Sequence, residues 1–211
     1  MQPWSDDIQQ QAAVFNAIGA DYELMFGNNQ DQQDLSQWLA DLLEPNSKVL
    51  DSGCGTGIPT AQTLAKAGHE VTCLEISAAM LNLARQNVPN GQYVLDSVNQ
   101  VNFDPNSFDA VVSFFALLML RRHDIEHALQ QFHHWLKPAG LLVLSMVEGD
   151  FDYIQIVIGD QPVFVTAYPQ AQLEAVITKA GFQILETRLQ HYVPHHGATP
   201  ETQIFIVAQR D

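Results

Sequence analysis

The residues best able to do chemistry in this sequence follow the apolar pair 49–50. They are an acid, Asp51, and then three alternate glycines, Gly53, Gly55 and Gly57. Glycine permits positive φ and lets the backbone approach a ligand closely. A helix that begins just after such a turn directs its first N–H groups into the same space, where they favour a carboxylate or a phosphate. The pattern therefore predicts a turn that binds a nucleotide cofactor.

The spacing of the glycines bears on which cofactor the turn binds. The dinucleotide fingerprint needs Gly-x-Gly-x-x-Gly. Its third glycine would fall at Ile58 when counting starts from Gly53, and at Thr60 when it starts from Gly55. Both frames fail, so the spacing argues against a nicotinamide-dependent oxidoreductase.

The run 49–57, with an acid two residues before its first glycine, resembles motif I of the class I S-adenosylmethionine (SAM)-dependent methyltransferases. SAM has no pyrophosphate, but it carries a sulfonium, an ammonium and a carboxylate. Asp51 would complement its cationic groups, and the helix N-terminus its carboxylate. Cys54 is expected at the cofactor as a small packing residue and not as a nucleophile.

Two further acids follow motif I at the ends of expected strands. Glu75 ends the alternating run 70–75, close to the spacing of about 20 residues at which a second-strand carboxylate accepts from ribose hydroxyls. Asp96 follows the run 93–95, and the resemblance implies that it contacts the adenine amino group. Their neighbours Ile76 and Ser97 are expected to line the adenine site.

Two later segments extend the resemblance. The run 108–115 is similar to motif IV, and its end is expected to place Ser113 at the cofactor and Phe114 toward the substrate. The run 136–144 resembles the Leu-Lys-Pro-Gly-Gly turn and the fifth strand of the family, with Ala139 in place of the first glycine.

Aromatic residues lie in segments that should open at the carboxyl ends of the strands, where open α/β sheets bind their ligands. Tyr22 is expected at the methionine end of the cofactor. Phe26 and Tyr153 are expected to contact the substrate, together with Phe114.

Histidines supply the candidates for acid–base work, since an unperturbed imidazole titrates near neutrality. His191, His195 and His196 are candidates for a base that deprotonates the acceptor. His123 and His127 match the His-x-x-Glu-His zinc pattern, but the helix that they begin buries its apolar residues on the opposite face. No metal is therefore expected there.

Strand and helix patterns alternate up to residue 146, which is typical of a parallel sheet with crossover helices. Two amphipathic helices precede this core, with the apolar stripes Ile8-Ala12-Phe15-Ile18 and Leu35-Trp38-Leu39-Leu42. The stretch 147–168 is less regular, with a short strand expected near 163–165. A helix and two strand-like runs, 182–190 and 202–209, close the chain.

The resemblance implies an α/β, Rossmann-like, doubly wound sheet of seven strands. The sheet would be mostly parallel with the last strand antiparallel, and helices would cover both faces. We expect one methyltransferase domain over 1–211. It would comprise a helical lid at 1–46, a SAM-binding core at 47–146, and a substrate-side segment with a C-terminal hairpin at 147–211.

The composition of the chain indicates which kinds of binding partner to expect. The chain has 211 residues, with 9 basic against 24 acidic side chains and a formal charge of −15. Such a field repels a polyanion, so a nucleic-acid substrate is not expected. The apolar run 110–120 is shorter than the roughly 20 residues of a membrane span, and the N-terminus lacks a signal-peptide pattern. Two cysteines without Cys-x-x-Cys spacing fit a reducing compartment, so we expect a cytoplasmic protein with no membrane partner.

The sequence thus predicts methyl transfer from SAM to an oxygen, nitrogen or carbon nucleophile of a small molecule, leaving S-adenosylhomocysteine. The proposed reaction is an in-line displacement in which the protein aligns and desolvates the reactants, so no catalytic triad is required. Two alternatives stay open: a SAM-binding protein that acts as a regulator or partner without catalysis, and the less favoured oxidoreductase. The acceptor, the acceptor atom and the oligomeric state, monomer or homodimer, are not determined by the sequence.

Overall fold

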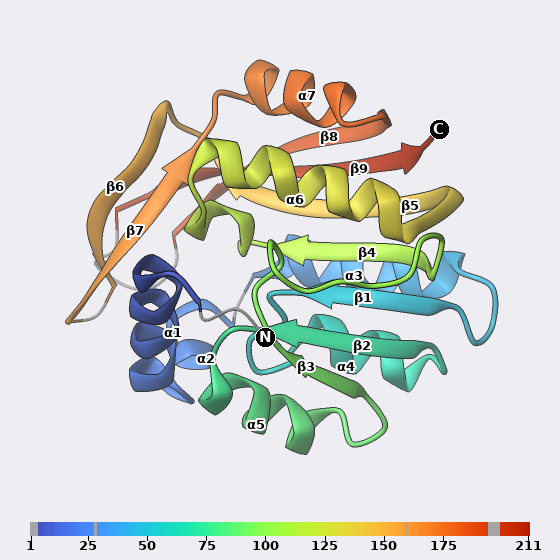
Figure 1. Ribbon diagram of the computed structural model, residues 1–211, viewed down its shortest axis with the longest axis horizontal. Helices are drawn as coiled ribbons and strands as arrows, with labels where there is room; N and C mark the ends of the chain where they lie inside the picture. The colour runs from blue at the N-terminus through green and yellow to red at the C-terminus, as the bar shows by residue number, and fades with distance from the viewer. Residues whose placement is uncertain (1–3, 28, 159, 194–198) are drawn as a thin grey trace.

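The computed structural model describes residues 4–27, 29–158, 160–193 and 199–211. Its main sheet has seven strands in the order β3-β2-β1-β4-β5-β9-β8 (Figure 1). These strands are β1 (Lys48–Ser52), β2 (Glu70–Glu75), β3 (Gln92–Leu95), β4 (Phe108–Phe114), β5 (Leu136–Val147), β8 (Phe182–Tyr192) and β9 (Glu201–Arg210). The first five pair in parallel, and β9 is antiparallel to both of its neighbours. The expected Rossmann-like sheet with an antiparallel last strand is confirmed.

Helices cover both faces of this sheet. They are α1 (Asp6–Ile18), α2 (Asp21–Phe26), α3 (Gln30–Leu42), α4 (Thr60–Lys66), α5 (Ala78–Asn87), α6 (Arg122–Trp135) and α7 (Gln170–Lys179), with a 3₁₀ turn, η1 (Leu117–Met119). Three of them begin at side-chain caps that satisfy otherwise free N–H groups. Ser5 accepts from Ile8 N, Asn29 accepts from the first turn of α3, and Ser77 accepts from Met80 N.

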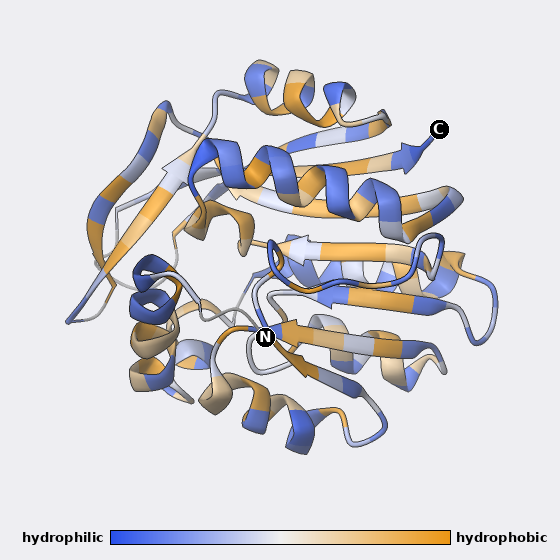
Figure 2. Cartoon of the chain, in the orientation of Figure 1, coloured by the Kyte–Doolittle hydropathy of each residue, from blue (hydrophilic) through white to orange (hydrophobic). Residues whose placement is uncertain are grey.

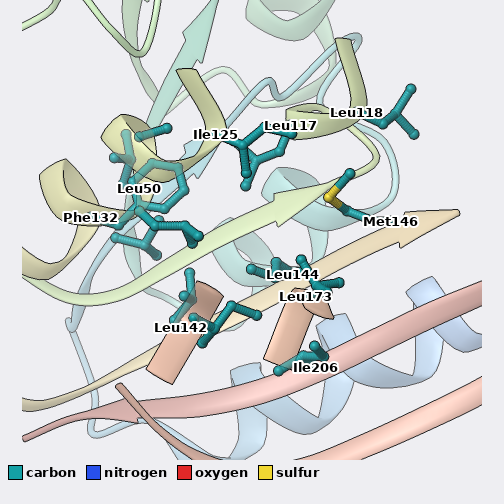
Figure 3. Close-up of a cluster of buried hydrophobic side chains, with 14 of the residues drawn as sticks. Leu50, Leu117, Leu118, Ile125, Phe132, Leu142, Leu144, Met146, Leu173 and Ile206 are labelled. Atoms are coloured by element: carbon teal, nitrogen blue, oxygen red, sulfur yellow. The ribbon is translucent and has the colours of Figure 1, made fainter. Parts of the chain in front are cut away.

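The central strands are buried on both faces, so they read as nearly continuous apolar runs. On one face Leu50 and Leu142 pack against Phe132 of α6 and Leu173 of α7 (Figure 3). On the other face strand residues such as Val49 pack against α3 and α4. The outward side of α6 is hydrophilic (Figure 2). His123 and His127, which were expected on this polar face, are exposed there, as is His134.

The segment after β5 differs from its prediction. Instead of one short strand, it forms an antiparallel hairpin of β6 (Phe151–Ile158) and β7 (Gln161–Ala167), separate from the main sheet. The strand β6 is mostly exposed, so no alternation of buried apolar residues marked it in the sequence. A second unpredicted element is α2, which lies between Gly19 and Gly27 and carries Tyr22 and Phe26.

The buried stripe of α3 is rotated relative to the predicted one. Trp38 and Leu42 are 37% and 53% exposed, whereas Ser36 and Ala40 are buried with Leu39. A polar contact explains the rotation, because the Ser36 hydroxyl donates to the Gln32 carbonyl oxygen and lies 3.2 Å from Thr60 Oγ1 of α4. The α3–α4 interface therefore contains hydroxyl groups that an apolar pattern does not reveal.

The helices α1 and α2 and the β6–β7 hairpin lie at the carboxyl ends of the central strands (Figure 1). Buried Gln11 of α1 donates from Nε2 to the carbonyl oxygens of Met119 and Phe164, and Asp7 pairs with Arg121 at 2.9 Å. These contacts hold α1 against η1 and the hairpin. In the described part of the chain, no helix has the length and apolar character that crossing a membrane requires.

Candidate active site

Two adjoining cavities open at the carboxyl ends of the strands, where open α/β sheets bind ligands. The smaller has a volume of about 340 Å³ and lies between β2, β3 and α1. The larger has a volume of about 1060 Å³ and lies between α2, the hairpin and β9. Seven residues line both cavities and form their common wall: Phe15, Tyr22, Gly53, Gly55, Phe114, Phe115 and Met119.

The glycines of motif I have three different local roles, and all have positive φ. A Cβ on Gly53 would lie 2.2 Å from Ala116 Cβ, so the backbone approaches its neighbour too closely for any side chain. A Cβ on Gly55 would meet no atom within 4 Å, because this residue faces the cavities. A Cβ on Gly57 would lie 3.0 Å from Val88 Cγ2, so this glycine packs against the end of α5 and lines neither cavity.

Glu75 is buried at the end of β2 and lines the smaller cavity. Its Oε2 accepts from Gly55 N at 3.0 Å, and its Oε1 accepts from Ser77 N at 2.9 Å. Burial raises the pKa of this carboxyl, and the backbone hydrogen bonds partly offset that rise. Each oxygen keeps one further acceptor position, so the carboxylate can still receive hydrogen bonds from a diol.

Asp51 lies underneath the glycine turn and not on a cavity wall. Its side chain is 3% exposed, and Oδ2 has no hydrogen-bond partner among the described residues. Burial, followed by the negative charge of Glu75, raises the pKa of this carboxyl to about 7, while a backbone hydrogen bond from Ala61 lowers it. The turn therefore covers a carboxyl that titrates near neutrality.

Asp96, on the wall of the smaller cavity, makes a contact that the sequence did not reveal. Trp4 donates from Nε1 to Asp96 Oδ1 at 3.0 Å, and Ser97 N donates to the same oxygen at 2.8 Å. Asp96, Ser97 and Ile76 all line the cavity, next to the apolar side chain of Met80. The expected adenine site is thus a polar edge beside an apolar wall.

The remaining expected cofactor residues divide between the cavities and the core. Tyr22 lines both cavities, and burial, then Glu23, Glu75 and Tyr192, raises the pKa of its phenol. Cys54 lines the larger cavity, and a hydrogen bond with Cys73, followed by burial, raises the pKa of its thiol, as a packing role requires.

Ser113 is fully buried and lines neither cavity. Its hydroxyl donates to the Ser52 carbonyl oxygen at 3.1 Å, which ties β4 to the end of β1. Ser113 therefore lies behind the cavity surface, where its hydrogen bond supports the start of the glycine turn.

The expected substrate residues lie at different cavities. Phe26 lines the larger cavity and Phe114 lines both. Tyr153 lines the smaller one, where its ring stacks on Phe164 at 4.9 Å between centroids, with the Arg121 guanidinium 3.9 Å from its centroid.

Of the histidine candidates for a base, His191 alone lies in the described part of the chain. His191 is exposed on β8, with Nδ1 3.2 Å from Thr202 Oγ1, and it lines neither cavity. His195 and His196 lie outside the described residues. Acids that the sequence analysis did not single out line the larger cavity instead. Among them are Glu23, which accepts from the Thr56 hydroxyl, and Glu201 of β9.

Comparison with known proteins agrees with this geometry. Residues 49–140 match the methyltransferase-domain family. A phosphoethanolamine N-methyltransferase of Plasmodium falciparum is 30% identical over 132 residues, which cover 59% of this chain and 50% of that protein. A demethylmenaquinone methyltransferase of Chlorobaculum tepidum is 28% identical over 191 residues, which cover 79% of this chain and 75% of that protein. The chain spans about half the length of the first of these relatives.

Among solved structures, a magnesium protoporphyrin IX methyltransferase of Synechocystis PCC 6803 with bound SAM superposes with a TM-score of 0.76. The superposition covers 100% of both chains at 18% identity, a level that establishes the fold. In the present chain, the motif I pattern occurs together with the strand order and the antiparallel last strand of this fold. The chain therefore contains a match to a methyltransferase domain at 49–140 and is similar in sequence and fold to the class I SAM-dependent methyltransferases.

Proposed function

We propose that this protein transfers a methyl group from SAM to a small-molecule acceptor. Two adjoining cavities with one common wall, formed in part by Gly53, Gly55 and Phe114, support this role most directly. The smaller cavity has Glu75 and Asp96, the glycine turn faces both cavities, and the larger cavity leaves room for a second reactant. A reaction that brings a nucleoside cofactor and a separate acceptor together needs this arrangement.

The residues present fit SAM. Glu75 would accept from the ribose hydroxyls, Asp96 from the adenine amino group, and the open space at Gly55 would receive the methionine part. Asp51 would stabilise the cationic groups from beneath the turn. When bound, SAM supplies an activated methyl group on its sulfonium.

The side chains of the common wall would align the acceptor and exclude water. Phe114 ends β4 there, and Phe115 follows it with φ 54 while its N–H donates to Ser145. Holding two reactants in reactive geometry is worth about 7–11 kcal/mol, so alignment can account for most of the rate enhancement. The net charge of −15 favours a small acceptor over a nucleic acid.

Calorimetric titration with S-adenosylhomocysteine, with NADH and NADPH as controls, tests the cofactor. One-to-one binding of S-adenosylhomocysteine alone supports the proposal, and binding of a nicotinamide cofactor alone would establish the oxidoreductase. Mass spectrometry of the denatured protein shows whether cofactor already fills the site. Methyl-labelled SAM with a panel of small acceptors then tests turnover. Saturable cofactor binding with a stable protein partner and no turnover on any acceptor would favour the non-catalytic alternative.

A further inference from the structure

The described charged residues on the wall of the larger cavity all have the same sign. Its charged lining residues within the described chain are all acids, Asp21, Glu23 and Glu201, and no lysine, arginine or described histidine lines it. Burying a negatively charged ligand among carboxylates is unfavourable, because like charges repel more strongly where water is excluded. The cavity therefore disfavours an acceptor that carries a carboxylate or a phosphate.

Most of the remaining wall is apolar. Apolar side chains come from α2, from the end of β4 and from the β6–β7 hairpin. Three of these side chains are well exposed for their type: Leu24 (82%), Val157 (65%) and Ile156 (37%). A ligand with an apolar body would cover this surface and gain about 25 cal/mol for each Å² of apolar area removed from water.

A short chain of hydrogen bonds forms the polar end of the cavity. Asn29 Nδ2 donates to Gln203 Oε1 at 2.8 Å, and Gln203 Nε2 donates to Glu201 Oε1 at 2.7 Å. Asn29 and Gln203 are 5% and 2% exposed, so these hydrogen bonds are buried and their geometry is fixed by the surrounding protein. The Gln203 amide donates to the carboxylate, and the hydrogen bond from Asn29 fixes that amide, so Glu201 is oriented as an acceptor.

The alternation of β9 places Glu201 on the cavity side. Successive residues of a strand point to opposite faces, so Glu201, Gln203 and Phe205 share one face. The Phe205 ring packs against Phe114 and Phe115 of the common wall, with centroids 6.1 and 5.7 Å away. The face of β9 that carries Glu201 is therefore the face directed at the two cavities.

The Tyr192 side chain lies next to Glu201. The phenol oxygen of Tyr192 is buried and makes no hydrogen bond to any described residue. Tyr192 and Glu201 both line the larger cavity, and they are partners in the β8–β9 register. A ligand that reaches this end of the cavity would meet the Glu201 carboxylate, beside the Tyr192 side chain.

We propose, on the basis of the methyltransferase function above, that the larger cavity binds a predominantly apolar acceptor without negative charge, which donates a hydrogen bond from an N–H or O–H group to the Glu201 carboxylate. An amine that is protonated on binding and a neutral alcohol or phenol both meet this description. Glu201 is then a residue that determines which acceptors bind.

Three indole compounds that differ only in charge test this inference: tryptamine (cationic), tryptophol (neutral) and indole-3-acetate (anionic). Their dissociation constants would be measured by ligand-observed NMR at pH 7, with and without S-adenosylhomocysteine. We expect tryptamine and tryptophol to bind saturably and indole-3-acetate to bind at least about 10-fold more weakly. Equal affinity for indole-3-acetate and tryptophol would overturn the inference, as would binding of none of the three to protein that binds S-adenosylhomocysteine.

Glu201→Gln separates the role of this carboxylate from the general charge of the protein. The glutamine can still accept from Gln203, so the hydrogen-bond chain survives. We expect tryptamine affinity to fall about 10-fold, and tryptophol and S-adenosylhomocysteine affinities to stay within about 2-fold. Glu70→Gln, at the opposite end of the sheet, removes the same charge and should change nothing.

An unchanged preference among the indoles in Glu201→Gln would overturn the role of Glu201. If S-adenosylhomocysteine fails to bind the wild-type protein, the proposed function fails, and the indole comparison on the cofactor-free protein still decides the inference.

Discussion

Replacing Asp51 by asparagine should remove a large pH dependence from the stability of the cofactor-free protein. This carboxyl is 3% exposed and its Oδ2 has no partner among the described residues. Burial, followed by the charge of Glu75, raises its pKa from the usual 3.8 to about 7. The folded protein therefore pays a free-energy cost to ionise a group that ionises freely in the unfolded chain.

The sign of the effect follows from the two pKa values. Between pH 4 and pH 7 the folded state binds more protons than the unfolded state, so the free energy of unfolding falls as the pH rises. The contribution of Asp51 to this free energy is highest below pH 4 and levels off above pH 7. A difference of about 3 pH units, at about 1.36 kcal/mol each, corresponds to about 4 kcal/mol. Asp51→Asn cannot ionise, so it should exceed the wild type at pH 8 by an amount of this order, less the cost of altering the Ala61 hydrogen bond.

Urea unfolding of the two cofactor-free proteins at several pH values between 5 and 8 measures the effect. Glu75 and Glu201 also have raised pKa values, but they are present in both proteins, so their contributions largely cancel in the comparison. Asp104→Asn, at an exposed position, is the control for loss of one negative charge. Parallel curves for wild type and Asp51→Asn would refute the buried, uncompensated carboxyl. The same variant should bind S-adenosylhomocysteine more weakly, because its side chain no longer offers a charge to the ammonium.

Three further substitutions have defined outcomes. Gly55→Ala places a methyl group in the open space at the common wall and should weaken S-adenosylhomocysteine binding by about 10-fold or more in calorimetry; unchanged affinity would show that the cofactor lies elsewhere. Trp4→Phe keeps an aromatic ring but loses the N–H donated to Asp96, so stopped-flow measurements should show S-adenosylhomocysteine dissociating a few-fold faster; an equal rate would separate Trp4 from cofactor closure. Ala139→Gly relieves φ 61 at an exposed turn and should raise the free energy of unfolding by about 0.5–1 kcal/mol in urea titration, whereas a decrease would show that the turn tolerates alanine without strain.

The cofactor side of the site was predictable because local pattern and sheet topology agree there. Strands β1 and β2 pair in parallel with Asp51 opposite Cys73, so the end of one strand brings Gly53 to the end of the other, beside Glu75. Once apolar runs mark the strands, the acids that follow them must meet at the same edge of the sheet. Glu75 and Asp96 therefore reach the smaller cavity as expected, while Asp51 and Ser113 lie just behind its surface.

The contacts that close the site were not predictable, because they join segments far apart in the chain without a periodic signal. No property of Trp4 in the sequence indicates that its indole reaches Asp96, and no pattern pairs Asn29 with Gln203. Tyr153 was assigned to the substrate from its position after β5. The structure places it in β6, with φ 56, beside Arg121 and on the wall of the smaller cavity, which the sequence did not indicate.

The acceptor recognition proposed above depends on elements that carry no motif. The helix α2, the β6–β7 hairpin and the start of β9 each contribute a few side chains to the larger cavity, and each contribution depends on how the chain packs. A motif records only what neighbouring residues in the sequence do together, so it identifies the cofactor turn and is silent about Glu201. The charges on the wall of the larger cavity bear on the chemistry of the acceptor, whereas the motifs do not. On the proposal above, a wall whose described charges are all negative would repel an anionic acceptor, and burial, which raises the pKa of Glu201, shows that water is largely excluded there. The chemistry of the acceptor is therefore better inferred from the composition of this cavity than from the motifs that establish the family.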